Sequence, residues 1–166
     1  TETVVFTGFF DYIGTLLLLL AELYGIIISS LGIFTSLHLL ERKPIDIRTV
    51  PIDDLPSVDV LIPTYNEDFD IVADTALSAQ MMLYPPEKLR ICVLDDGGTD
   101  QKIGDSDPAK AQAALNRRQK FQDFCADNGL TYITRARNLN AKAGNINSAL
   151  DTVDGDLILI LDCDHI

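Results

Sequence analysis

Basic residues are scarce in this sequence. Lysine and arginine together number 13, against 25 aspartates and glutamates, which gives a formal net charge of -12 at pH 7. A protein that neutralises the phosphates of nucleic acid needs a basic face, so this balance argues against nucleic acid as a partner. Most of the acidic residues are scattered among expected loops, which is typical of an ordinary solvated surface.

Cysteine is sparse as well. Cys92, Cys125 and Cys163 match neither a disulfide framework nor a metal-ligand spacing. We expect all three to be reduced, because a cytoplasmic location keeps thiols reduced, and to be buried as small apolar side chains. Cys163 lies between two acidic residues and is the only one expected near chemistry. The sequence also contains no internal repeat and no low-complexity segment.

A long hydrophobic run is the most prominent feature near the N-terminus. From Tyr12 to Leu40 almost every residue is apolar or small, with Glu22 and His38 as exceptions. Roughly 20 such residues cross a bilayer as a helix, so residues 1–40 are predicted to form a transmembrane segment. A carboxyl group at mid-membrane depth is tolerated when it is protonated or faces another helix, so Glu22 indicates further membrane helices.

The charges on either side of this run predict its orientation. Glu2 and Asp11 precede it, whereas Arg42, Lys43 and Arg48 follow it. By the positive-inside rule, residues from 41 onward lie in the cytoplasm. A secretory signal peptide is the competing interpretation, but the run is too long for one, has no basic segment before it and no convincing small-residue cleavage site after it.

Residues 41–57 are predicted to form an extended linker, because Pro44, Pro51 and Pro56 alternate there with aspartates. From Val58 onward strands and helices alternate, which is typical of an α/β fold with a mostly parallel sheet. We predict helices over about 68–83, 108–128 and 141–153 and a short strand over 130–134. The side chains expected on the buried helix faces are Val72, Ala76, Ala79, Leu83, Ala111, Leu115, Phe121, Phe124, Ala143, Ile146 and Leu150.

Three apolar strands end on polar residues. They are the segments 58–67, 91–98 and 157–165. The carboxyl ends of neighbouring parallel strands open on one edge of the sheet, where such folds bind ligands. Carboxylates crowded there would repel each other unless a cation lay among them, and oxygen ligands favour magnesium or manganese over zinc. The carboxylates expected around this crevice are Glu67, Asp95, Asp96, Asp162 and Asp164.

Each of these motifs also has a plain structural explanation. Asp95 and Asp96 before two glycines are typical of a turn, and Asp162 and Asp164 after a strand can cap the next turn. Side chains two residues apart on an extended segment nevertheless point to one face. Two ligands of one cation require that geometry, so Asp162 and Asp164 remain candidates for a metal site.

Lys142 and Tyr65 add to this crevice. Lys142 opens the last helix, where the helix dipole and free N–H groups favour an anion, although an exposed lysine at a helix end is equally common. Tyr65 follows the first strand and can stack on a flat base or serve as a core aromatic residue. A cation site, a phosphate-binding lysine and a base platform on one edge describe a pocket for a nucleoside diphosphate.

Four longer strings resemble a known family. They are Ile62–Glu67, Leu94–Gln101, Ala141–Leu150 and Asp162–His165, in this order and spacing. They resemble the first half of the catalytic domain of the bacterial cellulose synthases, which are membrane-embedded, inverting, processive glycosyltransferases. The likeness extends over about residues 12–166, since a helix and a short proline-rich linker precede the domain in that family too. The short Asp-Asp-Gly and Asp-x-Asp motifs alone are common to many sugar transferases.

The resemblance implies a fold and a site. The fold would be a Rossmann-like, nucleotide-sugar-binding sheet of the GT-A type, mostly parallel and incomplete, with residues 58–166 as the N-terminal half of the glycosyltransferase domain. The donor would be UDP-glucose and the product a β-1,4-glucan. The implied roles are uridine binding by Thr64, Tyr65 and Glu67, contacts to uracil and ribose from the catalytic-site pair Asp95 and Asp96, diphosphate binding by Lys142, and Mg2+ (or Mn2+) binding by Asp162 and Asp164.

The same resemblance indicates what this chain lacks. The family's general base is an aspartate in a Thr-Glu-Asp motif, followed by a Gln-x-x-Arg-Trp motif for the acceptor, and neither occurs in these 166 residues. We therefore expect a donor-binding half that does not polymerise glucose alone and that exposes apolar surface. The resemblance also implies a multi-pass protein of the bacterial inner membrane with a cytoplasmic catalytic domain, a periplasmic partner subunit and a cyclic-di-GMP sensor outside this chain.

Two alternatives remain at this stage. A related processive synthase of another glucan, chitin or hyaluronan would share the donor-side motifs. A non-catalytic membrane protein that retained a nucleotide pocket would bind UDP without turnover. A dinucleotide-dependent oxidoreductase is disfavoured, because Thr64–Glu67 stands where a Gly-x-Gly-x-x-Gly motif would follow the first strand.

Overall fold

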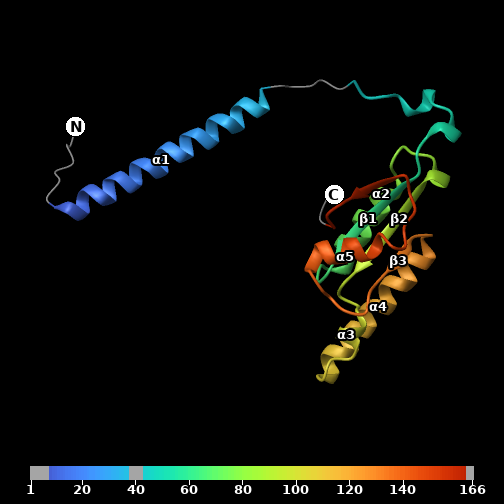
Figure 1. Cartoon of the computed structure of the whole chain (residues 1–166). Coiled ribbons are helices and arrows are strands. Elements are labelled where there is room, and N and C mark those ends of the chain that lie inside the picture. Colours follow the sequence, from blue (N-terminus) through green and yellow to red (C-terminus); the bar gives the residue numbers. More distant parts are fainter. Residues whose placement is uncertain (1–7, 38–42, 164–166) are drawn as a thin grey trace. The chain divides into compact units, whose positions relative to one another are not determined.

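A computed structural model describes residues 8–37 and 43–163 (Figure 1). The chain divides into two compact units, Thr1–Ile45 and Asp46–Ile166. The first unit contains the helix α1 (Phe9–Ser36), and the second contains the sheet. The predicted metal ligand Asp164 lies outside the described residues, as do His38 and Arg42.

Helix α1 confirms the predicted apolar helix. It has 28 residues, and none of its side chains is buried in the described part of the chain. Its most apolar window has a mean hydropathy of 2.2. At 1.5 Å per residue the helix exceeds the roughly 30 Å of bilayer hydrocarbon, so length and composition suggest a membrane location. The predicted orientation stays a prediction.

The described part of the linker contains two short turns. The 3-10 turns η1 (Ile47–Thr49) and η2 (Ile52–Asp54) interrupt the extended backbone that the prolines predict. Asp46 produces the first of them, because its side chain accepts a hydrogen bond from the Arg48 backbone N–H at 3.1 Å. The linker is therefore extended only in part.

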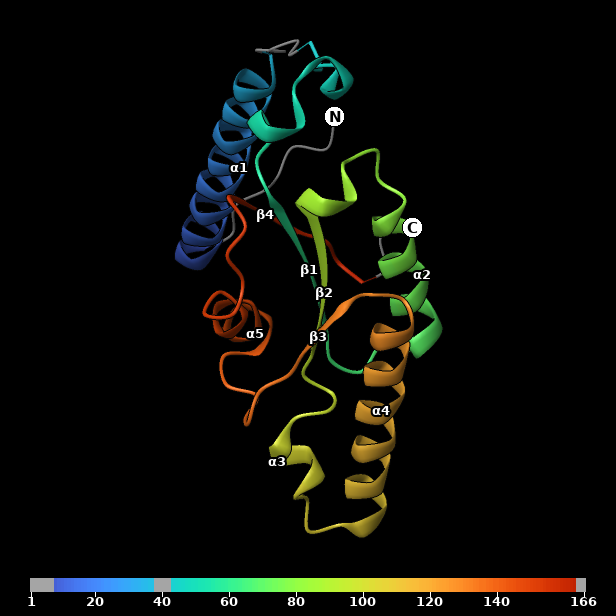
Figure 2. The same ribbon diagram turned by 90° about the vertical axis from the view of Figure 1, so that its right-hand side faces the viewer.

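The second unit is built on a parallel sheet of four strands. Their order is β3-β2-β1-β4 (Figure 2). The two central strands are buried through most of their length, so they appear in the sequence as continuous apolar runs. Thr64 and Asp95 are the last residues of the two central strands and are paired, so both strands end at the same level of the sheet. The strands are β1 (Val58–Thr64), β2 (Leu89–Asp95), β3 (Thr131–Ile133) and β4 (Leu157–Ile160).

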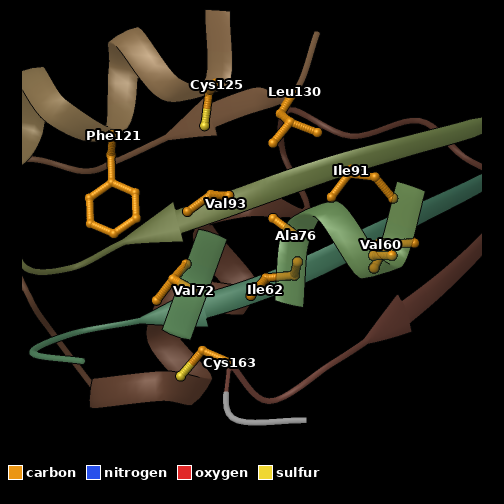
Figure 3. Close-up of a cluster of buried hydrophobic side chains, with 11 residues drawn as sticks. Val60, Ile62, Val72, Ala76, Ile91, Val93, Phe121, Cys125, Leu130 and Cys163 are labelled. Atoms are coloured by element: carbon orange, nitrogen blue, oxygen red, sulfur yellow. The ribbon is translucent and has the colours of Figure 1, made fainter. Parts of the chain in front are cut away.

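Helices cover both faces of this sheet, as Figure 2 shows. Helices α2 (Phe69–Gln80) and α4 (Pro108–Asp127) pack on one face, and α5 (Ala141–Ala149) packs on the other. The larger core lies under α2 and α4 (Figure 3). It contains Val60, Ile62, Val72, Ala76, Ala79, Ile91, Val93, Phe121, Cys125, Leu130 and Cys163. The predicted α/β class with a parallel sheet is confirmed.

Helix α4 begins as the sequence predicts. Asp107 is its N-cap and accepts a hydrogen bond from the Ala109 N–H at 2.9 Å, and Pro108 occupies the first helical position. Its buried face is offset from the prediction, because Ala114 is buried whereas Leu115 is 44% exposed. The short helix α3 (Asp100–Ile103) was not predicted.

Two predicted helix ends were too long. Helix α2 ends at Gln80, and Leu83 beyond it is 88% exposed. The chain leaves the helix before Pro85, because a residue that precedes proline avoids the helical region. Helix α5 ends at Ala149, and its buried residues are Asn145 and Ala149. The predicted Ile146 packs against the same core and is partly buried, while Ala143 and Leu150 are exposed. The predicted burial of Leu83, Leu115, Ala143 and Leu150 was therefore wrong.

Candidate functional site

A pocket opens at the carboxyl edge of the sheet, beyond the ends of β1 and β2. Its volume is about 440 Å³. Most of the sequence-predicted site residues line it, although they come from separate segments of the chain. The lining residues are Pro63, Thr64, Tyr65, Glu67, Asp96, Asn138, Ala141, Lys142 and Asn145. The structure therefore brings Thr64, Tyr65, Glu67, Asp96 and Lys142 together.

Glu67 closes the loop that follows β1. Its Oε2 accepts hydrogen bonds from the Thr64 hydroxyl at 2.8 Å, the Tyr65 N–H at 2.6 Å and the Asn66 N–H at 3.1 Å. Burial alone would raise the pKa of this carboxyl, but these donors outweigh burial and lower the pKa to about 2. Glu67 is thus a carboxylate at neutral pH and fixes the loop that carries Tyr65.

Asp95 is fully buried at the end of β2. Its Oδ1 accepts hydrogen bonds from the Gly97 N–H at 2.8 Å and from Arg117 Nε at 2.9 Å, and its Oδ2 accepts one from the Tyr132 hydroxyl at 3.0 Å. Burial, together with the charge of Asp95, raises the pKa of Tyr132. Asp95 therefore does not line the pocket, and both of its oxygens are bonded to protein groups.

Arg117 connects this carboxylate to the β1 loop. Its Nη1 donates to the Glu67 carbonyl oxygen at 2.8 Å, and its Nη2 donates to the Thr64 hydroxyl at 3.0 Å. A side chain on Gly97 would collide with Arg117 and with the Tyr65 carbonyl oxygen, so glycine is needed where the two loops meet. One guanidinium from α4 thereby holds the loops after β1 and β2 together.

Asp96 lines the pocket but is almost completely buried, with 2% of its surface exposed. Its two oxygens accept from Arg135 Nε and Nη2, both at 2.7 Å. Such a bidentate pair fixes both partners in one plane. Arg135 follows β3, on the way to the segment that starts α5.

The arginine pairs revise the electrostatic argument made from the sequence. Repulsion among the clustered carboxylates suggested a cation in the crevice, but Arg117 and Arg135 already neutralise Asp95 and Asp96. Over residues 8–37 and 43–163, no three His, Cys, Asp or Glu side chains group closely enough to hold a metal ion. The assignment of a metal to Asp162 and Asp164 stays a prediction, because Asp164 lies outside those ranges.

Lys142 lies in the first turn of α5 and contacts the Asp162 carboxylate beyond β4. Both side chains are about half exposed, at 52% and 48%. The segment before Lys142 has an unusual backbone, since Asn140 and Ala141 have φ values of 60° and 45°. The predicted phosphate-binding lysine and one predicted metal ligand are therefore neighbours.

Tyr65 is 43% exposed and lines the pocket. Lys102 of α3 places its Nζ 3.8 Å from the centre of the Tyr65 ring and donates a hydrogen bond to Asn66 Oδ1 at 3.3 Å. A cation over an aromatic face stabilises both groups. Lys102 thus fixes a ring that the sequence predicts as a base platform.

Arg117, Arg135 and Lys102 support the site but were not among the residues predicted from the sequence. One general signal was present, because two aspartates that end a buried strand need cationic or N–H partners. The sequence offered no means to choose which arginine serves which aspartate. The partners are separated from Asp95 and Asp96 by 22 and 39 positions.

The fold and the pocket define a class of protein. It is a parallel α/β domain with a polar pocket at the carboxyl edge of its sheet, where acidic side chains, a lysine and an exposed aromatic ring meet, as in nucleotide-binding proteins. The family model described as glycosyl transferase family 2 matches residues 59–166. The chain belongs to glycosyl transferase family 2. This membership confirms the predicted glycosyltransferase domain and supports a nucleotide-sugar donor.

Curated relatives share the whole length of this chain. The cellulose synthase catalytic subunit [UDP-forming] of Xanthomonas axonopodis pv. citri (strain 306) is 43% identical, with 100% of this chain and 20% of the relative covered. The protein of the same name from Pseudomonas fluorescens (strain SBW25) is 39% identical, with the same coverage. Cellulose synthase 1 of Komagataeibacter xylinus is 39% identical, and the chain covers 9% of it. The chain therefore spans a fifth or less of the length of these relatives. Their identity to it over its whole length confirms the resemblance noted from the sequence.

Among solved structures, the mannosyltransferase PcManGT from Pyrobaculum calidifontis has a TM-score of 0.42 and 26% identity. The alignment covers 74% of this chain and 31% of that protein.

Proposed function

We propose that this chain is the donor-binding part of a membrane-bound cellulose synthase. The complete enzyme would transfer glucose from UDP-glucose to a growing β-1,4-glucan with inversion at the anomeric carbon. The observation that carries this proposal is the pocket itself, in which the Tyr65 loop, Asp96 and Lys142 converge within a family 2 domain. Two relatives are UDP-forming cellulose synthases by name, which supports a UDP-linked donor and a cellulose product.

The uridine would bind beside the β1 loop, where Thr64, Tyr65 and Glu67 line the pocket. The exposed Tyr65 ring suits stacking on a base. The contact of Asp95 with uracil and ribose that the resemblance implies remains part of this proposal. Asp96 is assigned a different role, because Arg135 engages both of its oxygens. Lys142, at the other side of the pocket, would hold the diphosphate through its charge.

Asp162 is the described residue that fits a divalent metal. It offers a half-exposed carboxylate next to Lys142, and oxygen ligands of this kind suit Mg2+ or Mn2+. Together with Asp164 it would hold the ion, which when bound supplies positive charge beside the diphosphate. Lys142 would stabilise the negative charge that develops on UDP as the glycosidic bond breaks. For this role, Lys142 would exchange its contact with the Asp162 carboxylate for one with the diphosphate.

The site of action would be the bacterial inner membrane, with α1 as one of several spans and the sheet domain in the cytoplasm. A glucan chain, a periplasmic subunit and cyclic-di-GMP, bound by a domain outside this chain, complete the proposed set of partners. The periplasmic subunit and cyclic-di-GMP rest on the family resemblance alone, whereas the relatives' names support the glucan chain.

The direct test is calorimetry of UDP binding with and without Mg2+. We expect UDP binding that Mg2+ strengthens, loss of the Mg2+ effect in Asp162→Ala and in Asp164→Ala, and weaker UDP binding in Lys142→Ala. Lys88→Ala is the matched control, because Lys88 lines a separate pocket at the amino edge of the sheet. Absence of UDP binding under both conditions would refute the proposed donor site.

A further inference from the structure

The segment that carries Lys142 into the pocket is held by one guanidinium. Arg135 Nη1 donates to the Leu139 carbonyl oxygen at 2.7 Å, and Nη2 donates to the Ala141 carbonyl oxygen at 3.1 Å. Nη2 also reaches Asn138 Oδ1 at 3.0 Å. The backbone from 138 to 141 is therefore wrapped around the Arg135 side chain.

This segment needs such support because its backbone is strained. Asn140 and Ala141 both have positive φ, a region that side chains with a Cβ adopt at a cost. The segment also lies directly on the first turn of α5, where a Cβ on Gly144 would be 2.9 Å from Arg135 Nη1 and still closer to the Leu139 carbonyl oxygen. Hydrogen bonds from Arg135 offset the strain and fix where α5 begins.

Asp96 in turn holds Arg135. The Asp96 carboxylate is 3% exposed and the Arg135 side chain 10% exposed, and both carboxylate oxygens are engaged by the guanidinium. Removing either charge would leave the other buried without its counter-charge. The connection thus runs from Asp96, which directly follows β2, through Arg135, to the residue before Lys142.

We propose that Asp96 and Arg135 act as a positioning pair that sets the location of Lys142 for the diphosphate. In this assignment Asp96 contributes through Arg135 and not by direct contact with uracil or ribose. The inference rests on the proposed function, because it takes Lys142 as the diphosphate-binding group. It adds a residue, Arg135, for which the sequence motifs gave no role.

The test compares two ligands in the full-length protein reconstituted in membranes. UDP carries the diphosphate and uridine does not, so an effect transmitted through Lys142 changes the affinity for UDP alone. We expect Asp96→Asn, Arg135→Gln and Arg135→Lys each to weaken UDP binding about tenfold and to leave uridine binding, measured by saturation-transfer NMR, unchanged. In a Lys142→Ala background, the same substitutions should have no further effect on UDP binding.

A matched control and two further variants keep the test decisive. Arg137→Gln removes the same charge from an exposed position of the same segment and should leave UDP binding unchanged. If Arg135→Gln unfolds, the neutral pair Asp96→Asn/Arg135→Gln removes both buried charges together. Gly144→Ala displaces the segment from the first turn of α5 while both charged residues are retained, and it should also weaken UDP binding and not uridine binding.

Several results would overturn the positioning role. Equal loss of uridine and UDP affinity in Asp96→Asn would show direct contact with the nucleoside. Losses that multiply in the Lys142→Ala background would show that Arg135 does not act through Lys142. If the unmodified protein binds no UDP, the proposed donor site fails, and that outcome is separate from a failure of the positioning pair alone.

Discussion

At the scale of single residues, the domain depends on buried carboxylates that are neutralised by arginines. An ionised carboxylate is stable in a protein interior only when a counter-charge and hydrogen bonds replace water. Two of these pairs lie at the carboxyl edge of the sheet, where Asp96 lines the pocket, and one lies at the opposite edge. The pairs are Asp95 with Arg117, Asp96 with Arg135, and Asp59 with Arg90.

The Asp59–Arg90 pair is predicted to stabilise the amino edge of the sheet. Asp59 accepts from Arg90 Nε at 2.6 Å and from the Gly155 N–H at 2.6 Å, so it connects β1 with β2 and with the turn before β4. Asp59→Ala should lower the free energy of unfolding by about 2–4 kcal/mol, since two donors lose their acceptor. Asp154→Ala, which removes the exposed second partner of Arg90, should cost less than about 1 kcal/mol. Chemical denaturation of both variants checks the difference, and equal losses would contradict it.

Glu67 is predicted to make stability depend on pH on the acid side. Its pKa falls from 4.5 to about 2 on folding. A carboxyl whose pKa is lowered in the folded state stabilises above its unfolded pKa, and this contribution is lost as the pH falls toward the folded value. The stability difference between the native chain and Glu67→Gln should therefore be full at pH 7 and shrink from about pH 4.5 down to about pH 2. Denaturation curves at pH 7, 4 and 3 measure it, and a difference independent of pH would refute it.

At the scale of elements, the sequence predicted best those elements that carry a local chemical signal. The buried strands β1 and β2 have continuous apolar runs, and α4 has a capping aspartate followed by proline, so local chemistry defines them. The end of α5 has no such signal. Its exposed Leu150 and its buried Asn145 reverse the expected order of polarity, because Asn145 has a specific partner on the sheet.

Asn145 is predicted to anchor α5. Its Nδ2 donates to the Leu94 carbonyl oxygen on β2 at 2.9 Å, and the side chain is 2% exposed. Asn145→Ala removes this bond and leaves a buried carbonyl without it, so we expect a loss of about 1–3 kcal/mol and faster hydrogen exchange of the α5 amides. Asn147→Ala on the exposed side of the same helix is the control and should change neither. Unchanged exchange in Asn145→Ala would show that packing alone holds the helix.

At the scale of the whole molecule, the pocket could be predicted in outline because one rule of parallel sheets governs it. Strand ends that are distant in sequence meet at one edge, so Thr64, Tyr65, Glu67, Asp96 and Lys142 line one pocket. The supporting arginines could not be predicted, since their position follows from the packing of α4 and of the segment after β3. The exposed apolar face of β4 agrees with the expected apolar surface, with each of its residues between 37% and 53% exposed.

Cys92 on β2 and Cys125 on α4 are predicted to report unfolding of the whole domain through their reactivity. Burial raises the pKa of Cys92 to about 11 and that of Cys125 to about 12. Alkylation requires the thiolate, so at pH 8 even a reagent that reached Cys92 would react about a hundredfold more slowly than with an unperturbed thiol. These cysteines lie in the cores on opposite faces of the sheet, Cys92 toward α5 and Cys125 under α4. They should therefore become reactive together, with the rate set by global opening.

Iodoacetamide labelling over a denaturant series, followed by peptide mass spectrometry, measures each site. Labelling of one cysteine well before the other would show that the two faces of the sheet open independently, which the shared central strands β1 and β2 argue against.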